Sequence, residues 1–540
     1  MAANTVALDA LIPREDFAVE TLARPTTPLD RINVIHLEGH FFGSLLRKPD
    51  FQRETNQWTP QKVADLVKSF LDLDLIPAVI LWKSGQYYFV VDGAHRLSAL
   101  MAWIADDYGD RQKSMDYFGG RITQEQRRIA ERTRKLVNKT VGGSYAEYVS
   151  HRKNPAAAPP HMQARLSNLG DNSIIAQWVP ATDAETAEKS FFKINQAATP
   201  IDPTEKRILK SRRSASAIAA RAITHGGTGH KYWFAFEDSA KAAVETLGRE
   251  IFHALYDPPL DSQPLTTLDV PVAGRGYSAL PFVFDLVNHS NGIDVADTTA
   301  KATIVKDTLP DDPDGAETVR YLKVVQKRLA RLTGNNPSAL GLHPVVYFYT
   351  RSGAFQPTAF LAASLFFEEL AEANKLLAFT EIRARFEQFL IDHKVALSLL
   401  THKYGSGGRS LPWIKAYLEC VAHGFWSGKS GAEIQTQLAN DPNYAFLTVP
   451  RPAGLHAPSG KERKAFNTNT KTAAFFALAL PSAPKCAICQ GLVHKNSVQF
   501  DHVQRIRDGG GADVTNAQVT HPYCNSTYKE RFVAGGDPVP

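Results

Sequence analysis

The sequence predicts an α+β protein of several domains: a small α/β domain first, a mostly helical middle domain, and a compact metal-binding module at the end. The chain has 540 residues, which is more than a single hydrophobic core normally holds. Patterns for a helix, a hairpin and a second helix follow one another before residue 110, whereas helical periodicity dominates from about 183 to 440. Two pairs of cysteine or histidine residues with metal-binding spacing stand near the C-terminal end.

Turn and cap signals around short apolar patterns define the elements of the first domain. Residues 60–73 carry apolar side chains at helical spacing, and Thr59 with the proline after it is a typical helix start. Residues 78–82 and 87–91 are rich in β-forming side chains, and the four residues between them include a glycine, which indicates a hairpin. A second helix is expected to start at Gly93.

Composition sets the remaining boundaries. The proline-rich stretch at 154–160 indicates a break or an exposed loop. The clearest helical periodicity lies at 357–400, and prolines, a basic run and an Asn/Thr run before residue 485 are typical of a linker. The expected domains are 1–155 for a sensing domain, 156–450 for the helical middle domain, 451–484 for the linker and 485–540 for the final module.

The overall composition is that of a soluble globular protein. Hydrophobic residues make up 44% of the chain and charged residues 21%. Three of the four cysteines stand in the C-terminal motif, which indicates metal binding in a reducing compartment and not a disulfide framework. Residues 1–17 do not resemble a signal peptide, and the apolar stretch at 473–480 is too short to cross a bilayer. A cytoplasmic protein without a membrane partner is expected.

Positive charge is concentrated in two stretches, although the net charge of the chain is only +6. Residues 121–153 hold nine Lys or Arg residues against three Glu residues, and a second cluster lies at 206–213. Such stripes suit the phosphate backbone of DNA. A solvated helix face is the alternative interpretation.

The C-terminal string offers four ligands to a zinc ion. Cys486 and Cys489 form one pair with a two-residue gap, and His521 and Cys524 form the other. Two such pairs on tight turns match a tetrahedral structural zinc site. The expected zinc ligands are therefore Cys486, Cys489, His521 and Cys524, and His494 is an alternative to His521 as the fourth.

Between these pairs lie residues typical of a phosphodiesterase: Asp501 can ligate a hard cation, His502 can take a proton from water, and Asn516 can orient the histidine. The string resembles the zinc-bearing branch of the HNH nucleases over about residues 485–531. The resemblance implies a ββα-metal fold in which His502 is the general base and Asn516 is the middle residue of the motif. It also implies that Asp501 and Asn525 ligate a catalytic Mg²⁺ or Mn²⁺ ion. Asn525 stands where the founding motif has histidine, and an amide oxygen still ligates such a cation.

A zinc ribbon that only maintains structure or grips DNA is the alternative interpretation of this module. The spacing of the four zinc ligands is the same in both cases. The Asp501-His502 pair, the glycine turn at 508–511 and Asn516 favour a nuclease, because a purely structural ribbon requires none of them.

A second motif lies in the first domain and comprises Gln52-Arg53, Trp58 and the box from Asp92 to Arg96. It resembles the N-terminal domain of GmrSD-type restriction proteins, which is related to the ParB/sulfiredoxin fold, over about residues 40–110 and 190–210. In that family this box is associated with nucleotide binding and hydrolysis, so the resemblance implies the same role here. Ala94 stands where the family usually has glutamine, so this chain lacks that amide.

The residue types of the box suit a phosphate group. A glycine between a strand and a helix permits a sharp turn, and the helix start offers free N–H groups to an anion. Arginine forks bind phosphate oxygens, an aspartate can bind Mg²⁺ or water, and a histidine can contact phosphate. In the alternative interpretation Asp92 caps the helix and Arg96 pairs with an acidic neighbour. The expected nucleotide-binding residues are Arg53, Asp92, Gly93, His95 and Arg96.

Together the two motifs predict a DNA endonuclease of the restriction or phage-defence kind. The resemblance implies double-stranded DNA with modified bases or a phosphorothioate backbone as the substrate, and a nucleoside triphosphate as the regulator. Zinc is the expected structural metal, Mg²⁺ or Mn²⁺ the catalytic one, and a homo-oligomer is a further expectation. The alternatives are a non-catalytic DNA reader with a structural zinc module and a toxin-like nuclease without modification specificity.

Overall fold

The structure is a computed structural model, and it describes most of the chain. The described residues are 5–15, 29–38, 41–52, 54–180, 186, 188–190, 193, 203–260, 263–276, 279–293, 309–447 and 465–529. They form two compact units, and the division falls within two helices. The first unit comprises residues 1–218, 227–241 and 306–315, and the second comprises residues 219–226, 242–305 and 316–540.

A mixed six-stranded sheet is the centre of the first unit. Its strand order is β1-β3-β5-β4-β6-β2. Strands β4 and β5 form the antiparallel hairpin expected from the sequence, whereas β3 runs parallel to β5 and β6 runs parallel to β4. The strands are β1 (Arg14–Glu15), β2 (Arg31–Asn33), β3 (Leu46–Pro49), β4 (Val79–Ser84), β5 (Tyr87–Asp92) and β6 (Ser173–Trp178).

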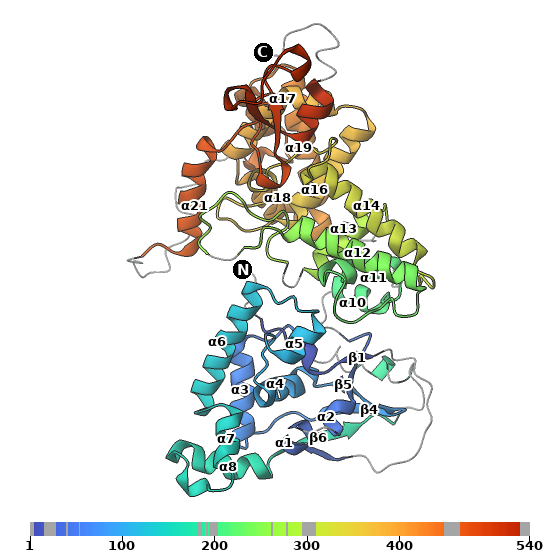
Figure 1. The fold of residues 1–540 in the computed structure, drawn as a ribbon, viewed down its shortest axis with the longest axis vertical. Coiled ribbons are helices and arrows are strands. Elements are labelled where there is room, and N and C mark those ends of the chain that lie inside the picture. Colours follow the sequence, from blue (N-terminus) through green and yellow to red (C-terminus); the bar gives the residue numbers. More distant parts are fainter. Residues whose placement is uncertain are drawn as a thin grey trace. The chain divides into compact units, whose positions relative to one another are not determined.

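Helices α3 and α4 lie beside this sheet, and α6 packs against α3 (Figure 1). Helix α3 starts after Thr59, whose side chain accepts a hydrogen bond from the Lys62 N–H, so the predicted cap is confirmed. Its apolar side chains Val63, Val67 and Phe70 are fully buried. The helices of the first unit are α1 (Val34–Glu38), α2 (Phe42–Leu45), α3 (Pro60–Leu71), α4 (Ala94–Ala105), α5 (Gln112–Tyr117), α6 (Gln124–Val141), α7 (Tyr145–His151), α8 (Pro160–Asp171) and α10 (Pro203–Lys210).

The second unit is mostly helical. Phenylalanine rings from α16 and α17 interlock in its core, for example Phe366 with Phe386 at 6.1 Å between ring centroids. Helix α20 starts with a complete capping box between Ser430 and Glu433. Helices α11 (Ala215–Thr224) and α12 (Asp238–Tyr256) are followed by α13 (Leu280–Ser290), α14 (Ala316–Thr333), α15 (Pro344–Tyr347), α16 (Pro357–Glu372), α17 (Leu376–Asp392), α18 (Ala396–Tyr404), α19 (Leu411–Trp426), α20 (Gly431–Asn440) and α21 (Thr468–Ala479).

The C-terminal part of the second unit holds an antiparallel pair of strands, β7 (Gln499–His502) and β8 (Ala517–Thr520). A π-helical turn, Cys524–Tyr528, follows them. Helix α21 lies within the segment expected to be a linker, and residues 451–464 of that segment lie outside the described residues.

The predicted mixture of α and β structure is confirmed. The ParB/sulfiredoxin-like fold of the first domain and the predicted domain boundaries stay predictions. Among the described residues, no helix is both long enough and apolar enough to span a membrane.

Candidate functional site

The four predicted zinc ligands meet in one buried cluster. The ligand atoms of Cys486, Cys489, His521 and Cys524 all lie within 4.8 Å of one another. Each pair sits on a turn: Gln490 has the positive φ of 58° that closes the first turn, and the second lies at the start of a helical segment. Three thiols and an imidazole at this separation fit a structural zinc ion.

The pKa values of the cysteines in the cluster also suit a bound cation. Hydrogen bonds with Cys489 and Cys524 lower the pKa of the Cys486 thiol far below its usual value. Burial, together with the hydrogen bond that the Cys489 thiol donates to Cys486, raises the pKa of Cys489 to about 12. A buried thiolate surrounded by thiols is the arrangement that a divalent metal converts to a full set of ligands.

A contact outside the cluster fixes the tautomer of His521. Its Nε2 lies 3.0 Å from the carbonyl oxygen of Leu492, which can only accept a hydrogen bond. Nε2 therefore carries the proton, and the unprotonated Nδ1 lies 3.3 Å from the sulfur of Cys489. Metal-binding histidines are typically fixed in this way by a carbonyl on the other ring nitrogen.

His494, the alternative ligand, does not belong to the cluster. Its side chain is buried at the start of a short turn, where Nδ1 accepts a hydrogen bond from the Asn496 N–H. Its ring packs at 5.4 Å from the ring of His343. Burial lowers the pKa of His494 to about 4. The geometry thus selects His521 as the fourth ligand.

Asp501 lies in the middle of β7, with an ammonium group beside it. Its Oδ2 accepts hydrogen bonds from Lys529 Nζ at 2.5 Å and from Gln518 Nε2 at 2.9 Å. Lys529 Nζ also donates to the His502 carbonyl at 3.0 Å. The Asp501 and Lys529 side chains are 11% and 14% exposed. Neither Lys529 nor Gln518 was expected from the sequence, although Lys529 stands one helical turn after Asn525.

His502 is the residue after Asp501 on β7. Its side chain therefore points to the opposite face of the strand pair from the side chain of Asp501. The ring is half-buried and makes no hydrogen bond to any other described residue. Phe500, on the same face of β7, is 71% exposed. This face therefore presents a histidine that is accessible to water and to a substrate.

Asn516 secures the loop that joins β7 to β8. Its Oδ1 accepts from the Gln504 N–H at 2.7 Å, and its Nδ2 donates to the carbonyl oxygens of Gln504 and Gly511 at 3.0 and 2.6 Å. A Cβ on Gly510 would lie 1.9 Å from the Gln504 carbonyl oxygen, so this approach requires glycine. Asn516 acts on the backbone after His502, and its predicted role in orienting the histidine stays a prediction.

Asn525 lies at the start of the π-helical turn and reaches β7. Its Nδ2 donates to Gln499 Oε1 at 3.1 Å. Gln499 and Asp501 lie on one face of β7 because side chains alternate along a strand. The geometry places Asn525 next to the face that carries Asp501, and the shared ligation of a cation by Asp501 and Asn525 stays a prediction.

In the first unit, the box lies where β5 turns into α4. Gly93 is the N-cap with φ +94°, and a Cβ there would lie 2.6 Å from Cγ1 of Val79. Asp92 therefore does not cap the helix. Its Oδ2 accepts instead from Arg96 Nη2 at 2.6 Å, and Nη2 also donates to the Ala78 carbonyl oxygen at 3.0 Å.

The loop with Gln52 and Trp58 reaches this box through an aromatic contact. The rings of Trp58 and His95 stack at 5.6 Å between centroids. Gln52 is buried. Arg53 lies outside the described residues, as does most of the downstream stretch 192–202.

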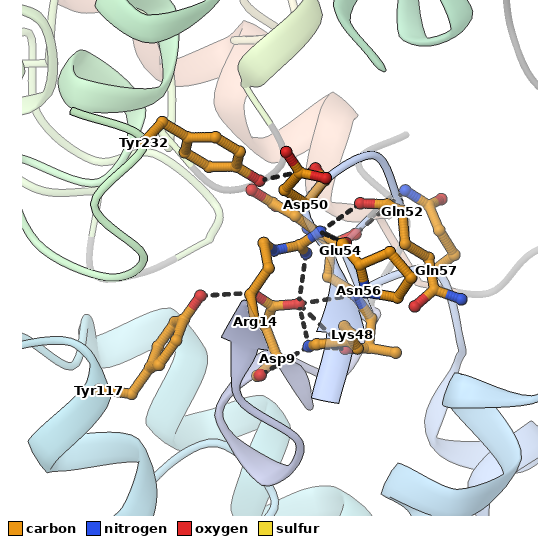
Figure 2. Close-up of polar contacts among 12 residues, drawn as sticks. Asp9, Arg14, Lys48, Asp50, Gln52, Glu54, Asn56, Gln57, Tyr117 and Tyr232 are labelled. Atoms are coloured by element: carbon orange, nitrogen blue, oxygen red, sulfur yellow. Dashed lines mark hydrogen bonds and ion pairs between the residues drawn. The ribbon is translucent and has the colours of Figure 1, made fainter. Parts of the chain in front are cut away.

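A charged network that was not expected from the sequence holds the loop with Gln52 in place (Figure 2). Asp9 Oδ1 accepts from Lys48 Nζ at 2.6 Å and from Arg14 Nη2 at 3.2 Å, and Oδ2 accepts from the Tyr117 hydroxyl at 2.7 Å. Arg14 also donates to the Gln52 carbonyl oxygen. Burial acts to raise the pKa of Asp9, but the charges of Lys48 and Arg14 outweigh it and hold that pKa well below its usual value.

Substitution of Asp9 by Asn should destabilise the first unit strongly, because Lys48 and Arg14 would remain buried without their counter-charge. Loss of one partner of a buried ion pair typically costs about 3–5 kcal/mol. Urea unfolding of the full chain measures this change. Asp65→Asn is the matched control, since Asp65 is exposed and bonds Gln61 on the surface of α3. Equal unfolding midpoints for the two variants would contradict the assignment.

Both basic stretches contain an arginine that is ion-paired within the first unit. On α6, Arg134 pairs with Asp106 at 2.8 Å and with Asp110 at 2.6 Å. In the second stretch, Arg212 pairs with Asp50 at 2.7 Å. These two arginines support the fold, whereas other basic side chains of α6 are exposed: Arg127, Arg128, Arg132, Lys135 and Lys139.

Comparison with known proteins matches both motifs. Residues 36–212 match the family model for the N-terminal domain of the GmrSD restriction endonuclease. Residues 486–531 match the family model for the HNH endonuclease. No curated protein and no solved structure matches the chain significantly. The chain therefore combines a GmrSD-type restriction endonuclease N-terminal domain with a C-terminal HNH endonuclease domain, which is the composition of a restriction-type DNA endonuclease.

Proposed function

We propose that this protein cuts modified DNA with its HNH domain under the control of a nucleotide bound to its N-terminal domain. One observation carries the cutting activity: Asp501 and His502 stand next to each other on β7, in the same module as the buried Cys486, Cys489, His521 and Cys524 cluster. A purely structural ribbon does not require an accessible imidazole next to this carboxylate on one strand.

In the proposed reaction His502 takes a proton from a water molecule, whose oxygen forms a bond to the phosphorus of the DNA backbone. The bond between phosphorus and the leaving oxygen then breaks, and the two strand ends separate. Asp501 and Asn525 would hold a Mg²⁺ or Mn²⁺ ion, which supplies charge stabilisation at the phosphate when it is bound. Lys529 keeps the Asp501 carboxylate oriented and offers positive charge at the same place.

The N-terminal domain is proposed to bind the phosphates of a nucleotide at the box. Gly93 gives the backbone its turn, the N-terminus of α4 offers N–H groups, and Arg96 offers a guanidinium. Asp92 holds that guanidinium in position at 2.6 Å. The exposed basic side chains of α6 are proposed to contact the DNA backbone.

Two substitutions in the box test the proposed nucleotide site. Substitution of Arg96 by Ala should weaken nucleotide binding or hydrolysis, and Asp92→Ala should impair turnover more than binding. Calorimetry with the full chain and each nucleoside triphosphate measures binding, and phosphate release measures turnover. Lys68→Ala, on the exposed surface of α3, is the control. If the wild type binds no nucleotide, the box is a structural element or a contact to DNA.

One observation favours a second candidate function, a DNA reader that does not cut. Asp501 is already neutralised by Lys529 at 2.5 Å, an arrangement that also suits a module that only grips DNA. Cleavage of DNA separates the two candidates. The test compares phage DNA with modified bases, phosphorothioate DNA and plain DNA, each with Mg²⁺ and with or without nucleoside triphosphates. Modification-dependent cutting supports the proposal, equal cutting of all DNAs indicates an unspecific nuclease, and binding without cutting indicates a reader.

A further inference from the structure

A buried ion pair on α17 belongs to no motif of the nuclease. Arg383 Nε lies 2.8 Å from Glu387 Oε1, and the two side chains are only 1% and 3% exposed. A charged pair this deeply buried is costly unless its other donors and acceptors are used. Arg383 also donates to the carbonyl oxygens of Leu340 and Gly341, and Glu387 also accepts from the Tyr347 hydroxyl at 3.0 Å.

Glu387 reaches the zinc-type cluster through one residue. Its Oε2 accepts from the Leu492 N–H at 2.7 Å, and the Leu492 carbonyl oxygen accepts from His521 Nε2 at 3.0 Å. Leu492 is therefore held at both of its backbone groups. A chain of hydrogen bonds runs from a carboxylate on α17 to the nitrogen opposite the ligand atom of His521.

Arg383 lies against the same turn. A Cβ on Gly491 would come within 2.5 Å of Arg383 Nε, so the backbone after Cys489 packs directly on the guanidinium. When zinc is bound, three thiolates outweigh the charge of the ion by one, and a neighbouring buried cation offsets that excess.

We propose that Arg383 and Glu387 of α17 complete the zinc centre of the HNH domain. Glu387 fixes the orientation of His521 through Leu492, and Arg383 balances the charge of the thiolates. The ion pair therefore tunes the metal affinity of a site from which it is separated by about a hundred residues in the chain. This proposal does not depend on whether the domain cuts DNA.

The test is zinc retention by the full-length protein. Zinc transfer from Arg383→Met and Glu387→Ala to a chromogenic chelator should show an affinity lower by about 10- to 100-fold, as expected for loss of a partner outside the ligand set. Arg383→Lys, which keeps the charge, and Glu387→Gln, which keeps an oxygen for Leu492, should lose less. Arg385→Met is the matched control, because Arg385 lies on the same helix but over the ring of Phe425.

A spectroscopic signature separates tuning from a loss of structure. In the cobalt-substituted protein, the sulfur-to-cobalt absorption should shift in Arg383→Met and stay unchanged in Arg385→Met. Wild-type zinc affinity and an unchanged cobalt spectrum in both Arg383→Met and Glu387→Ala would overturn the proposal. If these two variants fail to fold, wild-type values in Arg383→Lys and Glu387→Gln together would overturn it, and intermediate values would support it.

Discussion

Substitution of His502 by Ala should reduce DNA cleavage by about 10²- to 10⁴-fold, the usual effect of removing a general base. The side chain is not a member of the zinc-type cluster and makes no hydrogen bond to any other described residue, so fold and zinc content should stay unchanged. Nicking of supercoiled plasmid that carries the DNA modification, in the presence of Mg²⁺ and nucleoside triphosphate, measures the rate.

His402→Ala is the matched control for this variant. His402 is an exposed histidine near the end of α18 in the same unit, and its loss should leave the rate unchanged. A His502→Ala protein that nicks plasmid as fast as the wild type would remove His502 from the mechanism.

Substitution of Cys486 by Ser should abolish zinc binding and unfold the HNH domain. Structural zinc contributes on the order of 10 kcal/mol to modules of this size. The effect should extend into the helical part of the second unit, because Leu492, six residues after Cys486, is bonded to Glu387 of α17. The first unit has its own buried sheet and should survive.

Metal analysis and thermal unfolding of the full-length variant check this result. Cys420→Ser is the control, since Cys420 lies on α19 outside the cluster, where its sulfur accepts a hydrogen bond from Gln437 Nε2 at 3.5 Å. A Cys486→Ser protein that retains stoichiometric zinc would contradict the four-ligand assignment.

Short sequence signals were enough to predict several elements of the fold. The start of α3 depends on Thr59 and the proline after it, and the β4–β5 hairpin depends on a short turn with Gly85. The zinc ligands were predictable for the same reason, because Cys486 and Cys489 share one tight turn. In each case the deciding residues stand within a few positions of one another.

Contacts between distant charged residues were not predictable. Asp9 and Lys48 are 39 positions apart, and Glu387 and Leu492 are 105 apart. Charged residues are usually exposed, so no sequence pattern marks the few that are buried as a satisfied network. His521 was the expected fourth zinc ligand and is confirmed as a member of the cluster, but the sequence alone could not exclude His494, because only the folded backbone shows which histidine faces the cysteines.

The most direct test of the central claim is metal-dependent cleavage by the unmodified full-length protein. Supercoiled plasmid, modified phage DNA and phosphorothioate DNA are incubated with the protein in Mg²⁺ or Mn²⁺, with and without nucleoside triphosphates, and each reaction is repeated with EDTA. The account predicts nicked or linear products from at least one modified DNA, and only where the divalent cation is present. Intact DNA in every reaction, from protein that contains zinc and binds DNA, would contradict the assignment of a nuclease.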